Sequence, residues 1–171
     1  DGDENLKLEG ISHDKIIRVG NIMIDSLEML RKKVEKQTVY KELGLKQVEY
    51  GLITLHRPSN VDNSKILGTT CKLISRISQR IQLVFPVHPR TRKNLDQNGL
   101  MSSLIKTPGL SILEPMNYIR FMNLVFNCRF VITDSGGIQE ETTYLGIPCL
   151  TLRPNTERPI TINQGTNRLC K

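Results

Sequence analysis

Short apolar runs alternate with longer amphipathic segments along this chain, and this alternation limits the possible folds more than any other feature. Runs with the composition of buried strands lie at 16–19, 50–55, 81–87, 110–113, 129–133 and 147–152. Helical spacing predicts helices over 22–36, 61–80, 91–98, 117–127 and 136–145. Asp62 or Asn63 is a candidate N-cap for the second helix. Strands and helices that alternate in this way predict an α/β fold, in which a parallel sheet carries helices on both faces.

The composition is that of a globular domain. The chain has 171 residues, of which 38% are hydrophobic and 24% charged, so disorder and a fibrous class are both disfavoured. Apolar runs stay well short of the roughly 18 residues that a membrane-spanning helix needs. The first ten residues are polar and acidic, so we expect neither a membrane span nor a signal peptide.

The positive charge is unevenly distributed. Residues 1–50 hold 9 basic and 10 acidic side chains, whereas residues 51–171 hold 15 and 7, so the net charge of +7 arises in the later part. This excess favours an anionic ligand, above all a phosphate-bearing small molecule. Nucleic acid is disfavoured because aromatic residues are only 5% and the basic residues are scattered. The alternative is that the excess positive charge does not serve to bind any specific ligand.

The cysteines and histidines do not form a metal-binding motif. Successive cysteines are 57, 21 and 21 residues apart, which excludes paired zinc or redox motifs, and the three histidines are equally dispersed. We therefore expect no metal. A reduced, cytoplasmic protein is the simplest account of these cysteines.

Polar and charged residues follow four of the predicted strands. They are His56-Arg57, the segment 88–90, the segment 134–137 and the segment 153–158. In a parallel sheet the carboxyl ends of the strands meet at one edge, where ligands bind, so we expect these groups to converge.

The segment Ser135-Gly136-Gly137 carries the strongest chemical signal. A strand that ends in these residues and opens a helix brings unpaired N–H groups and the positive helix end to one place, which suits a phosphate. A tight turn without a ligand remains the alternative. Glu140 and Glu141 follow in the first turns, where one of them can face a ribose or both can simply suit the helix dipole.

His56-Arg57 and His88 are further candidates. A histidine donates or accepts a proton near neutral pH, and an arginine suits a diphosphate. Strand-end histidines satisfied by the backbone are the competing interpretation. Arg158 lies in a proline-rich loop, where a solvated side chain is the ordinary expectation.

Five motifs in order resemble those of the non-hydrolysing UDP-N-acetylglucosamine 2-epimerases. They are TLHRPSNVD (54–62), FPVHPRT (85–91), LEPMNYIRFMNL (113–124), VITDSGGIQEE (131–141) and TLRPNTERPITINQGTNRL (151–169). The resemblance implies one half of a GT-B architecture: residues 15–171 form a Rossmann-like C-terminal domain that binds the nucleotide sugar, and residues 1–14 are a remnant of the interdomain connection. Members of this family are about twice as long, so the N-terminal domain and final helices are expected to be absent.

The same resemblance implies roles for individual residues. His56 is implied as the catalytic residue at the reaction centre. Substrate-binding roles are implied for Arg57, His88, Met116, Phe121, Ser135, Gly136, Gly137, Glu141 and Arg158. Within this set, the Ser-Gly-Gly turn holds the diphosphate, Glu141 the ribose, and Met116 and Phe121 surround the uracil. His88 matches a histidine of a second, regulatory UDP-sugar site in some bacterial members.

The implied reaction is inversion at C2 of the sugar through elimination and re-addition of UDP, with no cofactor or metal. Its acid and base come from the absent domain, so the chain alone is expected to be inactive. The full-length protein is expected to be a homodimer, whereas this chain can be a monomer, and neither nucleic-acid nor membrane partners are expected. Ser59 stands where many members have glutamate. This departure leaves open an epimerase of a modified UDP-sugar, and a GT-B glycosyltransferase is the other alternative.

Overall fold

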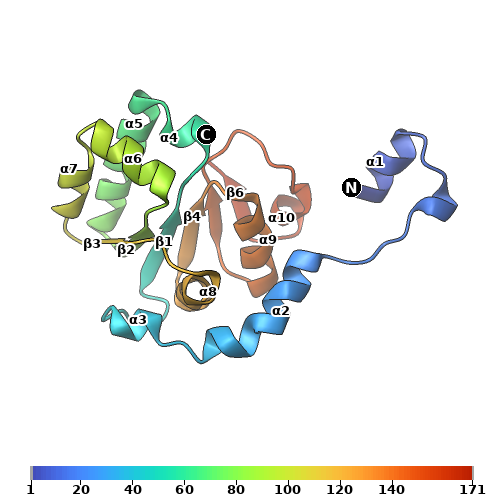
Figure 1. Cartoon of the computed structure of the whole chain (residues 1–171), viewed down its shortest axis with the longest axis horizontal. Coiled ribbons are helices and arrows are strands. Elements are labelled where there is room, and N and C mark those ends of the chain that lie inside the picture. The colour runs from blue at the N-terminus through green and yellow to red at the C-terminus, as the bar shows by residue number, and fades with distance from the viewer. Residues whose placement is uncertain (1, 171) are drawn as a thin grey trace.

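The computed structural model describes residues 2–170 and contains one parallel sheet (Figure 1). Its strands are β1 (Tyr50–Thr54), β2 (Gln82–Pro86), β3 (Leu110–Leu113), β4 (Phe130–Thr133), β5 (Cys149–Thr151) and β6 (Asn167–Leu169). They lie in the order β3-β2-β1-β4-β5-β6, and every neighbouring pair is parallel. This order confirms the predicted α/β fold.

Helices cover both faces of the sheet (Figure 1). The helical elements are α1 (Gly2–Leu8), η1 (His13–Lys15), α2 (Ile22–Glu35), α3 (Val39–Glu42), α4 (Pro58–Val61), α5 (Ser64–Ser78), α6 (Pro89–Gln97), α7 (Met101–Ile105), α8 (Tyr118–Asn127), α9 (Gly136–Leu145) and α10 (Pro159–Asn163). Helices α5, α6 and α7 lie on one side, whereas α2, α8 and α9 lie on the other.

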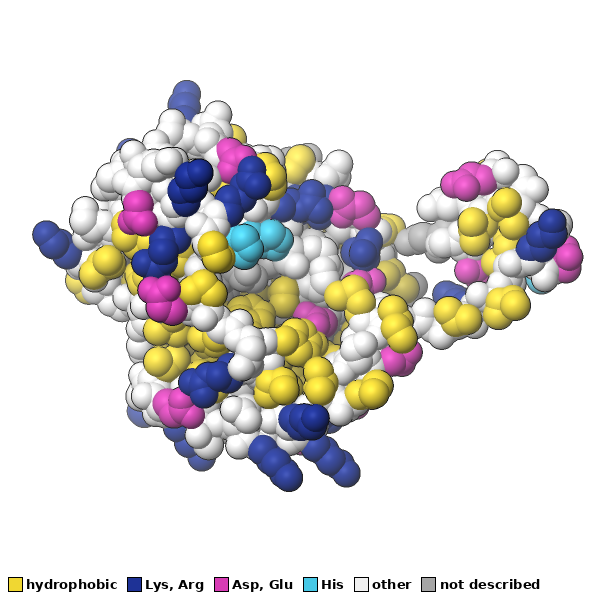
Figure 2. Space-filling model, in the orientation of Figure 1, with side chains coloured by type: hydrophobic (Ala, Val, Ile, Leu, Met, Phe, Trp, Pro, Cys, Tyr) yellow, Lys and Arg dark blue, Asp and Glu magenta, His cyan; other side chains and the backbone are white. Residues whose placement is uncertain are grey.

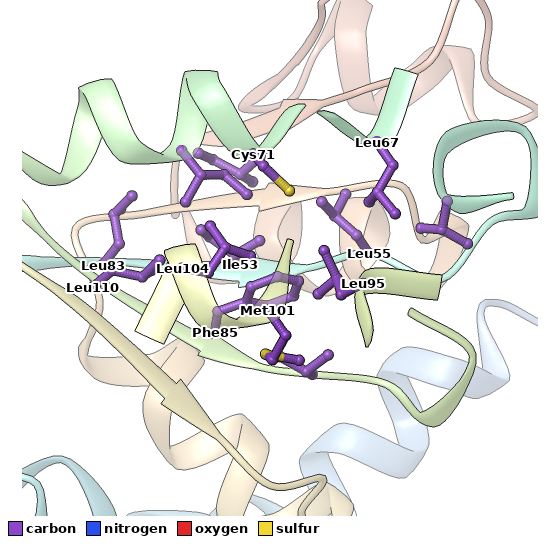
Figure 3. Close-up of a cluster of buried hydrophobic side chains, with 14 residues drawn as sticks. Ile53, Leu55, Leu67, Cys71, Leu83, Phe85, Leu95, Met101, Leu104 and Leu110 are labelled. Carbon is purple, nitrogen blue, oxygen red and sulfur yellow. The ribbon is translucent and has the colours of Figure 1, made fainter. Parts of the chain in front are cut away.

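Alternate strand residues point to the two helical layers. Ile53 and Phe85 belong to one buried cluster, together with residues of α5, α6 and α7, as Figure 3 shows. Leu52 and Val84, their neighbours in sequence, belong to the other cluster, with residues of α2, α8 and α9. Both faces of the central strands are therefore buried, which explains why these strands read as continuous apolar runs.

One predicted strand is wrong and one strand was not predicted. Residues 16–19 are not a strand: Ile17 is 78% exposed and Val19 85% exposed, because within residues 2–170 no strand pairs with this segment. Strand β6 instead completes the sheet beside β5. Its sequence is Asn-Arg-Leu, which has no apolar run to reveal it.

Helix boundaries also differ from those predicted. The helix predicted over 61–80 is α5, which runs only from Ser64 to Ser78, and Val61 ends a separate short helix, α4. The break arises because Asn63 leaves the helical conformation and caps α5 by accepting from the N–H groups of Lys65 and Ile66. Asp62, the other candidate cap, binds Arg90 instead. Helix α6 begins at Pro89 rather than 91, and α3, α7 and α10 are too short for periodicity to reveal.

The N-terminal segment stands apart from the layers. Figure 1 shows α1 and η1 separated from the sheet, with an extended stretch leading into α2, and neither element has a buried residue. Residues 1 and 171, the outer limits of the ranges expected for the connection and the domain, lie outside the described residues. None of the described helices is long and apolar enough to cross a membrane.

The turn before β3 requires glycine, and this requirement can be tested. Gly109 has a φ of +73°, and a Cβ there would lie 2.3 Å from the backbone oxygen of Ser78. We expect Gly109→Ala to lower the free energy of unfolding by about 3 kcal/mol, from left-handed strain and overpacking together. Gly99→Ala is the matched control, since its φ is +68° with nothing within 4 Å, and should cost only about 1 kcal/mol. Equal losses in urea denaturation would contradict the role assigned to Ser78.

Candidate functional site

The candidate site lies at the carboxyl edge of the sheet, where β1 and β4 end side by side. Thr54 pairs with Thr133, so the segments that follow these residues leave the sheet together. His56 and Arg57 come from the first segment, and Asp134 and Ser135 from the second. The sheet register therefore brings together two groups that are far apart in sequence.

The buried carboxylate of Asp134 fixes the His56-Arg57 turn. Asp134 is fully buried, and its carboxylate accepts from the backbone N–H of His56 at 3.1 Å and of Arg57 at 2.9 Å. Nδ2 of Asn60 donates to the same carboxylate at 3.2 Å, and Nδ1 of His56 lies 3.2 Å from Oδ1. These partners satisfy a charge that would be costly to bury alone. Asp134 was not among the predicted site residues, although its place directly after an apolar strand was a usable signal.

Two histidines meet at this edge. The rings of His56 and His88 are 5.4 Å apart between centroids, and Figure 2 shows two histidine side chains together, with Lys and Arg side chains nearby. His88 caps α6, because its Nδ1 accepts from the backbone N–H of Arg90. The side chain of Arg90 itself turns to Asp62. Burial, followed by the nearby charge of His56, lowers the pKa of His88.

The Ser-Gly-Gly turn opens α9 as the sequence predicts. Ser135 is the N-cap residue with an extended backbone, and its hydroxyl makes no capping hydrogen bond. The first N–H groups of a helix have no partner within that helix, so this end attracts anions. A Cβ at Gly136 would meet open space, whereas one at Gly137 would lie 2.7 Å from Cε of Met23. Gly137 therefore also allows α2 to pack closely against α9.

The neighbouring carboxylates Glu140 and Glu141 have different partners. Glu141 is only 4% exposed and accepts a 2.6 Å hydrogen bond from the hydroxyl of Tyr118, which sequence reasoning missed. Glu140 lies 3.1 Å from Nε of Arg158 and accepts from Nδ2 of Asn21. Burial raises the pKa of Glu141, and the charge of Glu140 adds to this. The two side chains thus point to different parts of the structure, because adjacent residues of a helix are about 100° apart around its axis.

The arginines near this edge are held by acidic groups. Arg153 is 4% exposed and donates through both of its terminal nitrogens to Glu157. Arg57 approaches the same carboxylate at 3.5 Å. The hydrogen bonds from Arg153 lower the pKa of Glu157 to about 2. Glu157 therefore stays ionised and links the loop after β5 to the turn after β1.

The remaining predicted residues lie at the start of α8. Met116 and Phe121 are half-buried and pack against the apolar cluster beneath α8. They flank Tyr118, which bonds Glu141. The structure thus joins His56, His88 and Asp134 directly, pairs Glu141 with the α8 segment, and places Arg158 against Glu140. Among the described residues, no cluster of three or more histidine, cysteine or acidic side chains could hold a metal ion.

The geometry offers three chemical functions along one edge. The end of α9 can hold a phosphate, the imidazoles of His56 and His88 can donate or accept hydrogen bonds, and the Glu141 carboxylate can accept from hydroxyl groups. Such a set suits a phosphorylated ligand that carries hydroxyl groups.

Comparison with known proteins identifies a matching family and relatives of similar sequence. The family model described as UDP-N-acetylglucosamine 2-epimerase matches residues 1–171. A UDP-N-acetylglucosamine 2-epimerase of Methanococcus maripaludis is 42% identical over 96% of this chain and 46% of its own length. A UDP-2,3-diacetamido-2,3-dideoxy-D-glucuronate 2-epimerase of Pseudomonas aeruginosa is 32% identical over 97% of this chain and 45% of its own. The chain spans about half the length of the curated relatives it matches.

Solved structures agree with this comparison. The UDP-GlcNAc 2-epimerase of Methanocaldococcus jannaschii in complex with UDP-GlcNAc and UDP is similar over 98% of this chain and 47% of that one, with 38% identity and a TM-score of 0.86. The enzyme of Neisseria meningitidis bound to UDP-GlcNAc is similar over 99% of this chain and 47% of that one, with 32% identity and a TM-score of 0.79.

The histidine pair predicts a pH-dependent signal. We expect His88 to titrate below its ordinary pKa of 6.5, and its pKa to rise in His56→Asn, because the variant removes a neighbouring positive charge. Below pH 6.5 the unfolded chain then binds more protons than the folded one, so stability falls as the pH falls through this range. Imidazole NMR measures the pKa. A His88 that titrates at or above 6.5, or is unaffected by the variant, would contradict the prediction.

Proposed function

The chain belongs to the UDP-N-acetylglucosamine 2-epimerase family, and we propose that it is the nucleotide-sugar-binding half of an enzyme that interconverts UDP-GlcNAc and UDP-ManNAc. Residues 15–171 are the binding domain in this proposal, and residues 1–14 belong to the connection with the other half. Because the chain spans about half the length of its relatives, the complete reaction is assigned to a longer protein.

The observation that carries the proposal is the unpaired end of α9 beside the His56 turn. Asp134 precedes Ser135 and also binds the backbone of His56, so the anion-attracting helix end and the histidine are held together. A UDP-sugar presents a diphosphate and a reacting sugar carbon next to each other. The similar structure from M. jannaschii is in complex with UDP-GlcNAc and UDP, which supports a UDP-sugar as the ligand.

In the proposed reaction, the bond between C1 and the diphosphate oxygen breaks while C2 loses its proton, and 2-acetamidoglucal and UDP form. Re-addition of UDP with protonation of C2 from the opposite face completes the inversion. The Ser135-Gly136-Gly137 helix end, with Arg57 and Arg158, stabilises the charge on the departing diphosphate. His56 contacts the sugar at the reaction centre. His88, which lies against the ring of His56, belongs to the substrate-binding surface.

The nucleoside extends from the helix end along α9 and α8. Glu141 lies one helical turn beyond Gly137 and accepts hydrogen bonds from the ribose hydroxyls. Ribose binding replaces or shares the hydrogen bond that Tyr118 now donates to this carboxylate. Met116 and Phe121, at the start of α8, contact the uracil.

The choice of sugar substrate follows the sequence identity to relatives that act on different sugars. The UDP-N-acetylglucosamine 2-epimerase of M. maripaludis is 42% identical, whereas the diacetamido-glucuronate epimerase of P. aeruginosa is 32% identical. UDP-GlcNAc is therefore the favoured substrate. Ser59 is the position to examine if a modified sugar proves better.

The proposal includes the setting in which the enzyme works. It acts in the cytoplasm, as a homodimer at full length, without a cofactor, a metal or a nucleic-acid partner. The chain alone is a monomer, or it associates through exposed apolar side chains such as Ile66 and Leu73 on α5.

Nucleotide binding is the direct test. We expect the chain to bind UDP but not AMP in titration calorimetry, and Glu141→Ala to weaken UDP binding about 10- to 100-fold, because hydrogen bonds to a charged group are lost. Glu49→Ala is the control and should not weaken binding, since this 64% exposed carboxylate precedes β1, at the opposite edge of the sheet from the site. Equal binding of UDP and AMP would remove the argument for uracil, and absence of both would contradict the proposed binding domain.

The chain alone should not catalyse the reaction. We expect no exchange of the C2 proton of UDP-GlcNAc in deuterated water with this chain, because the acid and base near C2 are assigned to the other half. The complete protein should show exchange and ManNAc-containing product without an added acceptor. Proton NMR measures both. Turnover by the 171-residue chain at the rate of a complete epimerase would overturn this division of labour.

A further inference from the structure

A buried network of hydrogen bonds joins the two segments assigned to the diphosphate. One segment is the Ser135 turn at the start of α9, and the other is the loop that carries Arg158. Gln139, Thr151, Thr161 and Asn167 are almost completely buried between them, at 0–2% exposed. Neither substrate contact nor proton transfer in the proposed reaction uses these side chains.

Gln139 is the centre of this network. Its Nε2 donates to the backbone oxygen of Ser135 at 3.2 Å. Its Oε1 accepts from the hydroxyl of Thr156 at 2.6 Å and from Nδ2 of Asn167 at 3.1 Å. Both ends of one buried amide are therefore engaged, one with the turn and one with the loop.

Thr156 connects Gln139 to Arg158. A carbonyl oxygen cannot donate, so the single hydroxyl proton of Thr156 points to Gln139. The hydroxyl oxygen is then an acceptor, and the backbone N–H of Arg158 donates to it at 3.0 Å. The direction of each bond along this path is thus determined, from Arg158 through Thr156 and Gln139 to Ser135.

The carbonyl of Arg158 is held as well. The hydroxyl of Thr161 donates to the backbone oxygen of Arg158 at 2.7 Å, and Nδ2 of Asn167 donates to Thr161 Oγ1 at 3.0 Å. Both backbone groups of Arg158 therefore depend on the same network. Its side chain lies against Glu140, the residue after Gln139 on α9, with Nε 3.1 Å from Oε2.

We propose that Thr156 and Gln139 are positioning residues that hold Arg158 at a set distance from the Ser135 turn, so that both contact one diphosphate. This inference rests on the proposed function for its ligand, but the network itself can be tested without a nucleotide. Fixed placement matters because a charged contact loses strength when its partner is free to move away.

Two substitutions at one position separate the hydroxyl from the shape of the side chain. Thr156→Val keeps the shape and removes the hydroxyl, whereas Thr156→Ser keeps the hydroxyl. We expect Thr156→Val to weaken UDP binding about tenfold, and Thr156→Ser to bind within about twofold of the unchanged chain. In an Arg158→Ala background, Thr156→Val should have no further effect, since its action passes through Arg158.

A matched control excludes a general loss of stability. Thr166 also donates a 2.6 Å hydrogen bond, to the backbone oxygen of Ile147, but no hydrogen bond connects it to Arg158. Thr166→Val should therefore destabilise the chain to a similar degree in urea denaturation and leave UDP affinity unchanged. Equal loss of affinity in Thr166→Val and Thr156→Val would overturn the positioning role.

Amide hydrogen exchange tests the network independently of any ligand. We expect the N–H of Arg158 to exchange at least about tenfold faster in Thr156→Val, and at the ordinary rate in Thr156→Ser and Thr166→Val. Unchanged exchange in Thr156→Val would refute the inference even if UDP binds. Absence of UDP binding by the unchanged chain, with the expected exchange pattern, would refute the proposed ligand and leave the network in place.

Discussion

A single buried carboxylate organises the functional edge of this protein. Asp134 directly follows β4, and its oxygens accept from the backbone of His56 and Arg57 and from the side chain of Asn60. The residue after it opens α9. A charged group without solvent is stable only when its hydrogen-bonding capacity is used, so the turn after β1 must follow the position of Asp134. The histidine and the anion-attracting helix end are consequently parts of one unit.

The second organising element is polar rather than ionic. Gln139 and Thr156 connect the same helix end to the arginine loop by neutral, partly buried hydrogen bonds. Together with the carboxylate, they leave the backbone around the diphosphate position little freedom. These loops are therefore largely ordered when the chain folds, so ligand binding carries little further cost in conformational entropy.

Much of the fold and part of the site could be predicted from the sequence. Composition and periodicity predict the apolar strands β1 to β5 and the helix that follows Ser135. Residues 16–19 show the limit of this reasoning, because an apolar β-branched run forms a strand only where another strand pairs with it. Strand β6 shows the converse: a polar segment becomes a strand because β5 offers it hydrogen bonds. Asp134, Tyr118 and Thr156 were missed as functional residues because their partners are distant in sequence.

The sequence by itself determined the class of fold, the family and the chemical groups available at the carboxyl ends of the strands. These follow from local properties: periodicity, charge and the order of short motifs. Only the tertiary structure decided which groups meet. It brought His56 against His88, placed Asp134 under the His56 turn, and gave Glu140 and Glu141 different partners. The reason is physical, since hydrogen bonds and burial depend on distances between segments, and those distances exist only once the strands are in register.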